Sequence, residues 1–305
     1  MIAIEDARKR YGDVVALDGV SLTVAEGESL GLVGTNGAGK TTLFRLLVGH
    51  ERPDSGQVRV AGVDPAAGVA VRERVGYLPE DVGFQPVLTG REVLDFHADM
   101  RGGAEAGVDT LLGVVGLTDA ADRPVGEYSN GMNRRLGLAT ALLGDPAVLL
   151  LDEPAAGLDP GGVAAFNRVV RRVRDERDVT VVLSTHVLSE VEALCDRVAV
   201  LDDGDLRTVG TVDEVARAAA ETVTVTARFE DPERGLAALR DAVEGVTPAV
   251  TLAETTDAVE VTCDREEVTA VLGAVVETDP DSVAVDEPGL DAAFRDAVDL
   301  GGEPA

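Results

Sequence analysis

The chain has 305 residues, enough for one large domain and a smaller one, and 45% of them are hydrophobic. It carries 56 acidic residues against 27 basic ones, and a surface this negative argues against binding to nucleic acid, whose phosphates attract Lys and Arg. The two cysteines, Cys195 and Cys263, stand alone, so the sequence predicts neither a disulfide framework nor a zinc site and suits a reducing cytosol.

Strand and helix patterns begin within the first sixty residues. Short apolar stretches over 15–24 are broken by Asp18-Gly19, which predicts a hairpin. The apolar run 29–33 leads into a glycine-rich stretch, and helical periodicity follows it. We therefore expect strands over 29–33 and 57–60 and a helix over 40–48.

The middle of the chain changes from a helical pattern to buried strands. From residue 89 to 143 apolar residues recur with helical spacing, and strands resume at 148–151 and 179–183 with a helix over 162–174 between them. A strand, a crossover helix and another strand, with continuous apolar runs, indicate a parallel sheet covered on both faces. Further elements expected here are strands over 198–201 and 206–209 and a helix over 212–219.

The composition changes after about residue 220, because residues 221–305 hold 21 acidic residues and only five arginines. Strands and helices are expected there in the order βαββαβ, followed by one more helix, which predicts a small ferredoxin-like module. We expect two domains, 1–215 with a helical subdomain at about 88–143, and 221–305. The elements of the second are expected over 222–229, 231–243, 250–252, 258–263, 265–276, 282–285 and 289–298.

A phosphate-binding pattern lies at the first strand-to-helix junction, where residues 34–41 match G-x-x-x-x-G-K-[ST]. Glycines let backbone N–H groups converge on phosphate oxygens at the positive end of a helix. We expect Lys40 to reach the β- and γ-phosphates and the Thr41 hydroxyl to bind Mg²⁺. A glycine-rich turn that only opens a helix is the alternative, but the complete pattern favours a nucleotide triphosphatase. The predicted phosphate-binding residues are Asn36, Gly37, Gly39, Lys40, Thr41 and Thr42.

Two carboxylates, Asp152 and Glu153, follow the expected strand over 148–151. We expect Asp152 to hold Mg²⁺ through its water shell and Glu153 to polarise the attacking water as general base. Taken alone, an Asp-Glu pair after a strand is more typical of a helix start. The phosphate-binding loop upstream favours the catalytic interpretation.

Residues 128–136, Tyr-Ser-Asn-Gly-Met-Asn-Arg-Arg-Leu, predict a helix start capped by Ser129. They also resemble the signature motif of ABC ATPases, which Ser129 and Gly131 match, in the Tyr/Phe-Ser-x-Gly-Met form of ABC-2-type exporters. The other family elements follow in order, and the resemblance covers about residues 1–215. Arg10-Tyr11-Gly12 resembles the segment with the adenine-stacking aromatic, 156–159 the D-loop with Asp159, and Ser184-Thr185-His186 the switch segment with its histidine.

The resemblance implies an ATPase that uses ATP and Mg²⁺ and works as a head-to-tail homodimer. One copy would hold ATP with Tyr11, Lys40 and Thr41. Ser129 and Gly131 of the other copy would close on the γ-phosphate. His186 of the first copy would assist hydrolysis, which would drive a separate membrane-spanning permease from the cytoplasmic face of the membrane.

One position departs from the family pattern, because Glu80 stands where the Q-loop glutamine is usual. A carboxylate oxygen is a hard ligand that can still face Mg²⁺, although Glu adds a charge and loses the amide donor. The same substitution resembles ABC-2-type ATPases, so we still expect activity.

The cargo and one rival function stay open at this point. Residues 76–84 and 88–92 are most similar to the ATPase of the copper-processing transporter of nitrous-oxide reductase maturation, but the isolated cysteines and methionines form no copper motif. Drug, lipid or polysaccharide export is the other cargo hypothesis. A soluble, ATP-gated regulatory ABC protein without transport is the alternative function. The acidic residues are spread over the whole chain, and Lys9 and Lys40 are its only lysines, which predicts a protein of a high-salt organism.

Overall fold

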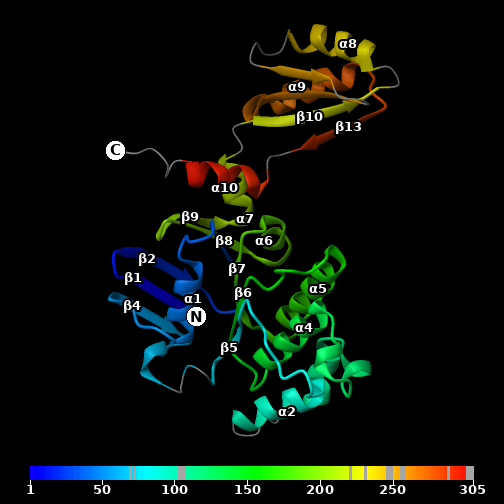
Figure 1. The fold of residues 1–305 in the computed structure, drawn as a ribbon. Helices are drawn as coiled ribbons and strands as arrows, with labels where there is room; N and C mark the ends of the chain where they lie inside the picture. The colour runs from blue at the N-terminus through cyan, green and yellow to red at the C-terminus, as the bar shows by residue number, and fades with distance from the viewer. Residues whose placement is uncertain are drawn as a thin grey trace. The chain divides into compact units, whose positions relative to one another are not determined.

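The computed structural model describes residues 1–68, 71, 73–101, 107–219, 222–229, 232–244, 250–254, 258–286 and 289–299. The chain divides into two compact units, Met1–Val212 and Asp213–Ala305 (Figure 1). The strands of the first unit are β1 (Ile2–Tyr11), β2 (Val14–Val24), β3 (Ser29–Val33), β4 (Ser55–Val60), β5 (Val75–Leu78), β6 (Val148–Asp152), β7 (Thr180–Thr185), β8 (Arg197–Asp202) and β9 (Asp205–Thr211). Its helices are α1 (Lys40–Val48), α2 (Gly90–Met100), α3 (Val108–Val114), α4 (Asn130–Ala141), α5 (Pro160–Arg177) and α6 (Leu188–Leu194).

The centre of the first unit is a six-stranded sheet with the order β5-β6-β7-β3-β8-β9. Neighbours from β5 to β8 are parallel, and β9 pairs antiparallel with β8, so the sheet is mixed. Every residue of β3, β6 and β7 is buried, as their continuous apolar runs predict. Because these three strands are parallel neighbours, the segments that follow them meet at one edge of the sheet.

The two faces of this sheet pack into two different cores. Along β6, Leu149 and Leu151 join the helical side with Phe166 of α5, whereas Leu150 joins the core around Phe44 of α1. The second core also receives a three-stranded antiparallel sheet with the order β2-β1-β4. Figure 1 shows α4 and α5 on one side of β6 and this small sheet with α1 on the other. Side-chain alternation along β6 therefore fixes which layer covers which face.

The predicted hairpin over 15–24 is wrong, because β2 is one continuous strand along β1. The turn lies earlier, at Gly12-Asp13 between the two strands. Asp18 and Gly19 lie inside β2, where the register with β1 shifts and Gly19 adopts φ 78°. Glycine tolerates this left-handed conformation, so the Asp-Gly pair marks a bulge here and no chain reversal.

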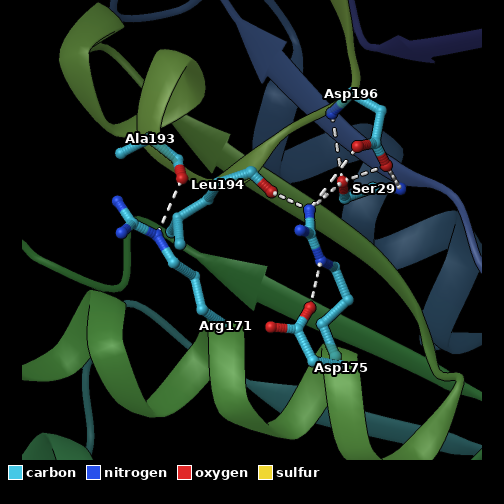
Figure 2. A network of polar contacts seen from close by, with 7 residues as sticks. Ser29, Arg171, Asp175, Ala193, Leu194 and Asp196 are labelled. Atoms are coloured by element: carbon cyan, nitrogen blue, oxygen red, sulfur yellow. Dashed lines mark hydrogen bonds and ion pairs between the residues drawn. The ribbon is translucent and has the colours of Figure 1, made fainter.

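A polar network joins the amino ends of β3 and β8 to the helices beside them (Figure 2). The hydroxyl of Ser29 donates to the Asp196 carboxylate at 2.5 Å, and Nη1 of Arg174 donates to the Ser29 hydroxyl at 3.1 Å. The same nitrogen donates to the carbonyl of Leu194, the last residue of α6, also at 3.1 Å. Arg174 therefore satisfies a carbonyl at a helix C-terminus and ties α5 to the sheet.

The second unit contains a four-stranded antiparallel sheet with the order β11-β12-β10-β13. On β10, Val223, Val225 and Ala227 are buried and alternate with threonines that are more exposed. Apolar residues of the helices, among them Leu239 and Val271, complete its core. Its strands are β10 (Thr222–Arg228), β11 (Thr251–Glu254), β12 (Val259–Asp264) and β13 (Ser282–Asp286), and the helices are α7 (Val212–Ala219), α8 (Pro232–Glu244), α9 (Val268–Glu277) and α10 (Leu290–Asp299). Within the described parts of both units, no helix is long and apolar enough to cross a membrane.

Candidate active site

The glycine-rich loop predicted to bind phosphate connects β3 to α1 as expected. Gly39 caps α1 with φ 108°, and a Cβ at this position would lie 2.4 Å from the carbonyl oxygen of Ala16 on β2. Only glycine fits there. Nζ of Lys40 folds back over the loop and donates to the carbonyls of Gly34 at 2.7 Å and Thr35 at 3.3 Å. The loop thus surrounds the ammonium of Lys40, and the N–H groups of Lys40, Thr41 and Thr42 precede the first intrahelical bond, which Leu43 donates to Gly39.

A hollow of about 320 Å³ lies over this loop and collects most of the predicted residues. Of the predicted site residues, Glu80 follows β5, Glu153 follows β6 and His186 follows β7, so three strand ends contribute to it. The parallel order of the strands therefore brings residues far apart in the sequence to one place. The hollow is lined by Val14, Ala16, Thr35, Asn36, Gly37, Gly39, Lys40, Thr41, Thr42, Glu80, Glu153, Ala156 and His186.

Glu153, which lines this hollow, is held in an unusual backbone conformation. Its φ is 42°, in the left-handed region that costs a residue with a Cβ roughly 1–2 kcal/mol. Its N–H donates to Ser184, to the carbonyl at 3.1 Å and to the hydroxyl at 3.0 Å. Its carboxylate lies 3.5 Å from Nζ of Lys40 and 2.9 Å from Nδ1 of His186. The two predicted catalytic residues are therefore in direct contact.

Asp152 is buried behind Glu153 and accepts hydrogen bonds from two hydroxyls. The hydroxyl of Ser184 donates to one carboxylate oxygen at 2.5 Å, and that of Tyr77 donates to the other at 3.3 Å. Burial raises the pKa of Tyr77 first, and the negative charge of Asp152 raises it further. Tyr77 thus keeps its proton and remains a donor to Asp152 at all physiological pH values.

The signature-like residues lie in a second hollow, separate from the first. Ser129 is the N-cap of α4, as predicted, and its hydroxyl accepts from the N–H of Met132. Asp159 caps α5 by accepting from the N–H of Gly162 at 2.6 Å. Ser129, Gly131 and Asp159 line a hollow of about 180 Å³ that shares no residue with the hollow around Lys40. A single copy of the chain therefore does not bring these three residues to Lys40.

Tyr11 lies at the end of β1 and is 40% exposed, and it is not among the residues that line either hollow. Its hydroxyl donates to the Glu51 carboxylate at 2.5 Å, and Nζ of Lys9 lies 5.6 Å from the ring centroid. The ring is thus fixed at its polar end, and Tyr11 as a whole stays exposed enough for its ring to contact a ligand.

Comparison with known proteins identifies the family. The family model described as "ABC transporter" matches residues 17–156. The chain is 39% identical to the daunorubicin resistance ATP-binding protein DrrA3 of Streptomyces coeruleorubidus, over 96% of this chain and 94% of that protein. This chain belongs to the ABC transporter ATP-binding proteins. It is therefore an ATPase, and the resemblance drawn from the motifs is confirmed at the level of the family.

Two further relatives agree with this assignment. The chain is 38% identical to the bacitracin transport ATP-binding protein BcrA of Bacillus licheniformis, over 68% of each protein. Among solved structures it is similar to cbiO1 of Clostridium perfringens, described as part of the ABC transporter complex cbiONQ, with a TM-score of 0.64, 29% identity and coverage of 72% of this chain and 93% of that one. The ABC nucleotide-binding fold is thus shown for the first unit.

The oxygen donors of this ABC ATPase fit a magnesium ion that is held together with a nucleotide. In the part of the chain that the structure describes, no group of three or more His, Cys, Asp or Glu is arranged to hold a metal alone. Mg²⁺ normally takes only one or two protein ligands and completes its shell with phosphate and water. Thr41 and Glu80 line the hollow around Lys40, and Asp152 lies behind Glu153, so hard oxygen ligands are present where phosphates would bind.

Sequence reasoning missed three residues that organise this site: Tyr77, Ser184 and Arg134. Tyr77 lies in the segment that was examined for Glu80, and Ser184 in the segment that was examined for His186. Their hydroxyl contacts to Asp152 depend on how β5, β6 and β7 align, which the sequence does not give. Arg134 binds two backbone carbonyls, at Pro79 and Glu153. No pattern of side chains marks a backbone carbonyl, so no signal in the sequence could have pointed to it.

Proposed function

We propose that this chain is the ATP-hydrolysing subunit of an ABC-2-type exporter whose membrane-spanning part is a separate polypeptide. The observation that carries the proposal is the hollow in which Glu153 contacts both Lys40 and His186 beyond the ends of three parallel strands. A phosphate-binding lysine, a carboxylate base and a histidine at one place are the parts needed for hydrolysis of a γ-phosphate.

In this proposal the residues divide the chemistry among them. The loop residues Asn36, Gly37, Gly39, Lys40, Thr41 and Thr42 hold the phosphates. Glu153 accepts a proton from the water whose oxygen attacks the γ-phosphorus as the bond to ADP breaks, and His186 contacts the γ-phosphate. Thr41, Glu80 and Asp152 would hold Mg²⁺, which neutralises developing charge on the phosphate oxygens.

We propose that two copies complete each site in a head-to-tail dimer. Ser129, Gly131 and Asp159 line their own hollow, away from Lys40, so they are suited to serve the nucleotide of a second copy. α4 offers a helix N-terminus there, whose N–H groups and dipole favour an anion such as the γ-phosphate. Tyr11, which is partly exposed, is proposed to stack on the adenine of its own nucleotide.

A permease partner is supported by apolar side chains around α2. Val87, Phe96 and Met100 are 81%, 58% and 71% exposed, and Phe96 and Met100 belong to α2. Phe96 and Met100 are four residues apart and so lie on one face of α2, and exposed large apolar side chains on one face usually mark a contact with another protein. We propose that this surface docks the permease at the cytoplasmic face of the membrane, which makes the chain a peripheral subunit.

We propose that the second unit is a ferredoxin-like module and that the ATPase domain ends near residue 215. From β10 to β13 the second unit has the element order βαββαβ and an antiparallel sheet with the strand order β11-β12-β10-β13, and both support a ferredoxin-like module. The division at Val212–Asp213 lies close to the expected boundary.

For the cargo we propose a drug-like or lipid-like molecule in preference to copper. The relatives reported above include proteins named for daunorubicin resistance and for bacitracin transport, both of them for organic compounds. A copper-processing role, which the residues around Glu80 resemble, finds no support in a cluster of metal ligands within the described residues.

The test measures ATPase activity against protein concentration in molar KCl for the wild type and Glu153→Gln, with gel filtration in ATP and Mg²⁺. We expect activity to rise more than linearly with concentration. We expect Glu153→Gln to lose about 10³-fold in kcat, because it removes the base, and to remain dimeric in ATP. Linear activity, a variant that keeps its activity and no ATP-dependent dimer would instead favour the regulatory ABC protein without transport.

A further inference from the structure

One buried cation, Arg134, lies between the two halves of the proposed catalytic machinery. Arg134 belongs to α4 and is 5% exposed. Its Nη1 donates to the carbonyl of Pro79 at 2.6 Å, and its Nη2 donates to the carbonyl of Glu153 at 2.5 Å. Burial lowers the pKa of the guanidinium, whereas the carboxylates of Glu80, Asp81, Asp152 and Glu153 oppose that change. A buried arginine with both arms on backbone carbonyls is costly to desolvate, so its position calls for a reason beyond packing.

The peptide of Glu153 is fixed on both sides. On one side its N–H binds Ser184, and on the other its carbonyl binds Arg134. The residue between these two bonds has φ 42°, a conformation that persists only where its surroundings enforce it. The direction of the Glu153 carboxylate, toward Lys40 and His186, follows from this backbone. Arg134 therefore helps to aim the catalytic carboxylate without touching the reacting atoms.

The same side chain connects three segments: α4, the segment that leads into Glu80, and the segment that follows β6. α4 begins directly after Ser129, so Arg134 stands little more than one helical turn from the proposed signature end. Pro79 directly precedes Glu80, which lines the hollow around Lys40. A shift of α4 along its axis would move the guanidinium relative to both carbonyls, because a helix moves as a rigid unit.

We propose that Arg134 is a positioning residue that couples Glu153 in one ATP site to α4, whose N-terminus serves the other ATP site of the dimer. The proposal rests on the head-to-tail dimer proposed above. When ATP binds Ser129 of one copy, it fixes the position of α4 in that copy. Arg134 on this helix then holds the backbone of Glu153 in the same copy, so that the carboxylate points toward its target. Neither site then hydrolyses at full rate until the other is filled, which is a coupling between sites.

The first test compares Arg134→Met, Arg134→Lys and a matched control, Arg174→Met. Arg174 also donates to a backbone carbonyl, that of Leu194, but beside the amino ends of β3 and β8. We expect Arg134→Met to lower kcat by about 10²-fold with little change in KM, because a misaimed base costs rate rather than binding. We also expect the Hill coefficient for ATP to fall to about 1. Arg134→Lys should recover part of kcat, since one ammonium reaches one carbonyl, and Arg174→Met should leave kcat and the Hill coefficient at wild-type values.

Mixed dimers with two affinity tags show where Arg134 acts. In one dimer Arg134→Met and Glu153→Gln lie on different copies, so the only intact Glu153 belongs to the copy that lacks Arg134. In the other dimer both changes lie on one copy, and the partner is wild type. We expect the first dimer to be the slower by about tenfold or more, since Arg134 aims Glu153 within its own copy.

The outcomes separate this proposal from the one on which it rests. Absence of an ATP-dependent dimer in the wild type, or an active Glu153→Gln, defeats the proposed function itself. If that dimer forms but Arg134→Met keeps the wild-type kcat and Hill coefficient, the coupling role is refuted. Equal loss of kcat in Arg134→Met and Arg174→Met, in step with their melting temperatures, would likewise refute it, because it would mean a structural role alone.

Discussion

The two ends of the six-stranded sheet use similar chemical groups for different purposes. At the amino ends, Ser29 hydrogen-bonds to both Arg174 and Asp196, and Arg174 also binds the last carbonyl of α6. At the carboxyl ends, Glu153 shares its carboxylate between Lys40 and His186 on a backbone in the left-handed region. One end is a network of satisfied partners, whereas the other keeps groups that a phosphate can engage. An arginine bound to a carbonyl thus connects a helix to the sheet at one end, whereas at the other it is proposed to aim the catalytic carboxylate.

Among the following substitutions, that of His186 at the carboxyl ends of the strands should lower ATPase activity most. We expect His186→Ala to lower kcat by about 10²-fold, because Glu153 loses its 2.9 Å partner and the γ-phosphate loses a donor. The measurement is steady-state ATPase activity at saturating ATP. His97→Ala is the control, since His97 lies on α2 outside both hollows, and its kcat should not change. Equal activity of His186→Ala and the wild type would contradict the proposed role.

Tyr77→Phe should have a smaller effect, confined to the carboxyl end. We expect the Mg²⁺ concentration for half-maximal ATPase activity to rise by about tenfold, because Asp152 loses one of the two hydroxyls that orient it. The raised pKa of Tyr77 also makes a prediction about stability. The unfolded tyrosine ionises near pH 10 while the folded one keeps its proton, so this group favours the unfolded state increasingly as the pH rises above about 10.

Chemical denaturation as a function of pH tests that second prediction. The loss of stability of the wild type above about pH 10 should be steeper than that of Tyr77→Phe, which has no proton to lose there. Identical slopes for the two proteins would show that Tyr77 titrates in the folded protein as it does in the unfolded chain.

Arg174→Met should change stability and leave catalysis alone. Loss of its hydrogen bonds to Ser29 and Leu194 should lower the free energy of unfolding by about 1–3 kcal/mol. Thermal unfolding followed by circular dichroism measures the change, and ATPase activity well below the transition supplies the control. A large loss of kcat with an unchanged melting temperature would mean that the two ends of the sheet are not independent.

Salt should change the stability of the whole protein through its net charge of −29, without distinguishing the two ends of the six-stranded sheet. Raising KCl from about 0.1 M to about 1 M shortens the Debye length from about 10 Å to about 3 Å and screens the repulsion between surface carboxylates. We expect the melting temperature to rise and the difference between wild type and Arg174→Met to stay nearly constant. A melting temperature that does not increase with KCl would oppose the high-salt interpretation of the composition.

Much of the fold followed from local patterns in the sequence. The buried strand β3 and the helix α1 have the bounds that their apolar runs predict, because a continuous run and a glycine loop leave little choice. β1 was not predicted, since most of its exposed positions are filled by charged residues and its partners β2 and β4 come later in the chain. β5 is only four residues long and has only one neighbour among the described strands, so its pattern alone was too weak.

The candidate site divides in the same way. Residues with a spacing rule, such as Lys40 and Ser129, could be assigned from the sequence, and the structure places them at the helix starts that the rule requires. The separation of Ser129 from Lys40 could not be derived from spacing, since it depends on how α4 packs. Arg134 was out of reach for a similar reason, because its partners are peptide groups brought together only by the fold.

The two cysteines make the protein convenient for labelling. Cys263 is buried and Cys195 half-buried, and burial raises the pKa of both thiols. Because the thiolate is the reactive form, both should resist maleimides at neutral pH. A cysteine introduced on an exposed face of α2 or α5 would then be the one reactive thiol, without removal of the native pair. Paired fluorophores on two copies could follow the approach of Lys40 of one copy to Ser129 of the other in real time.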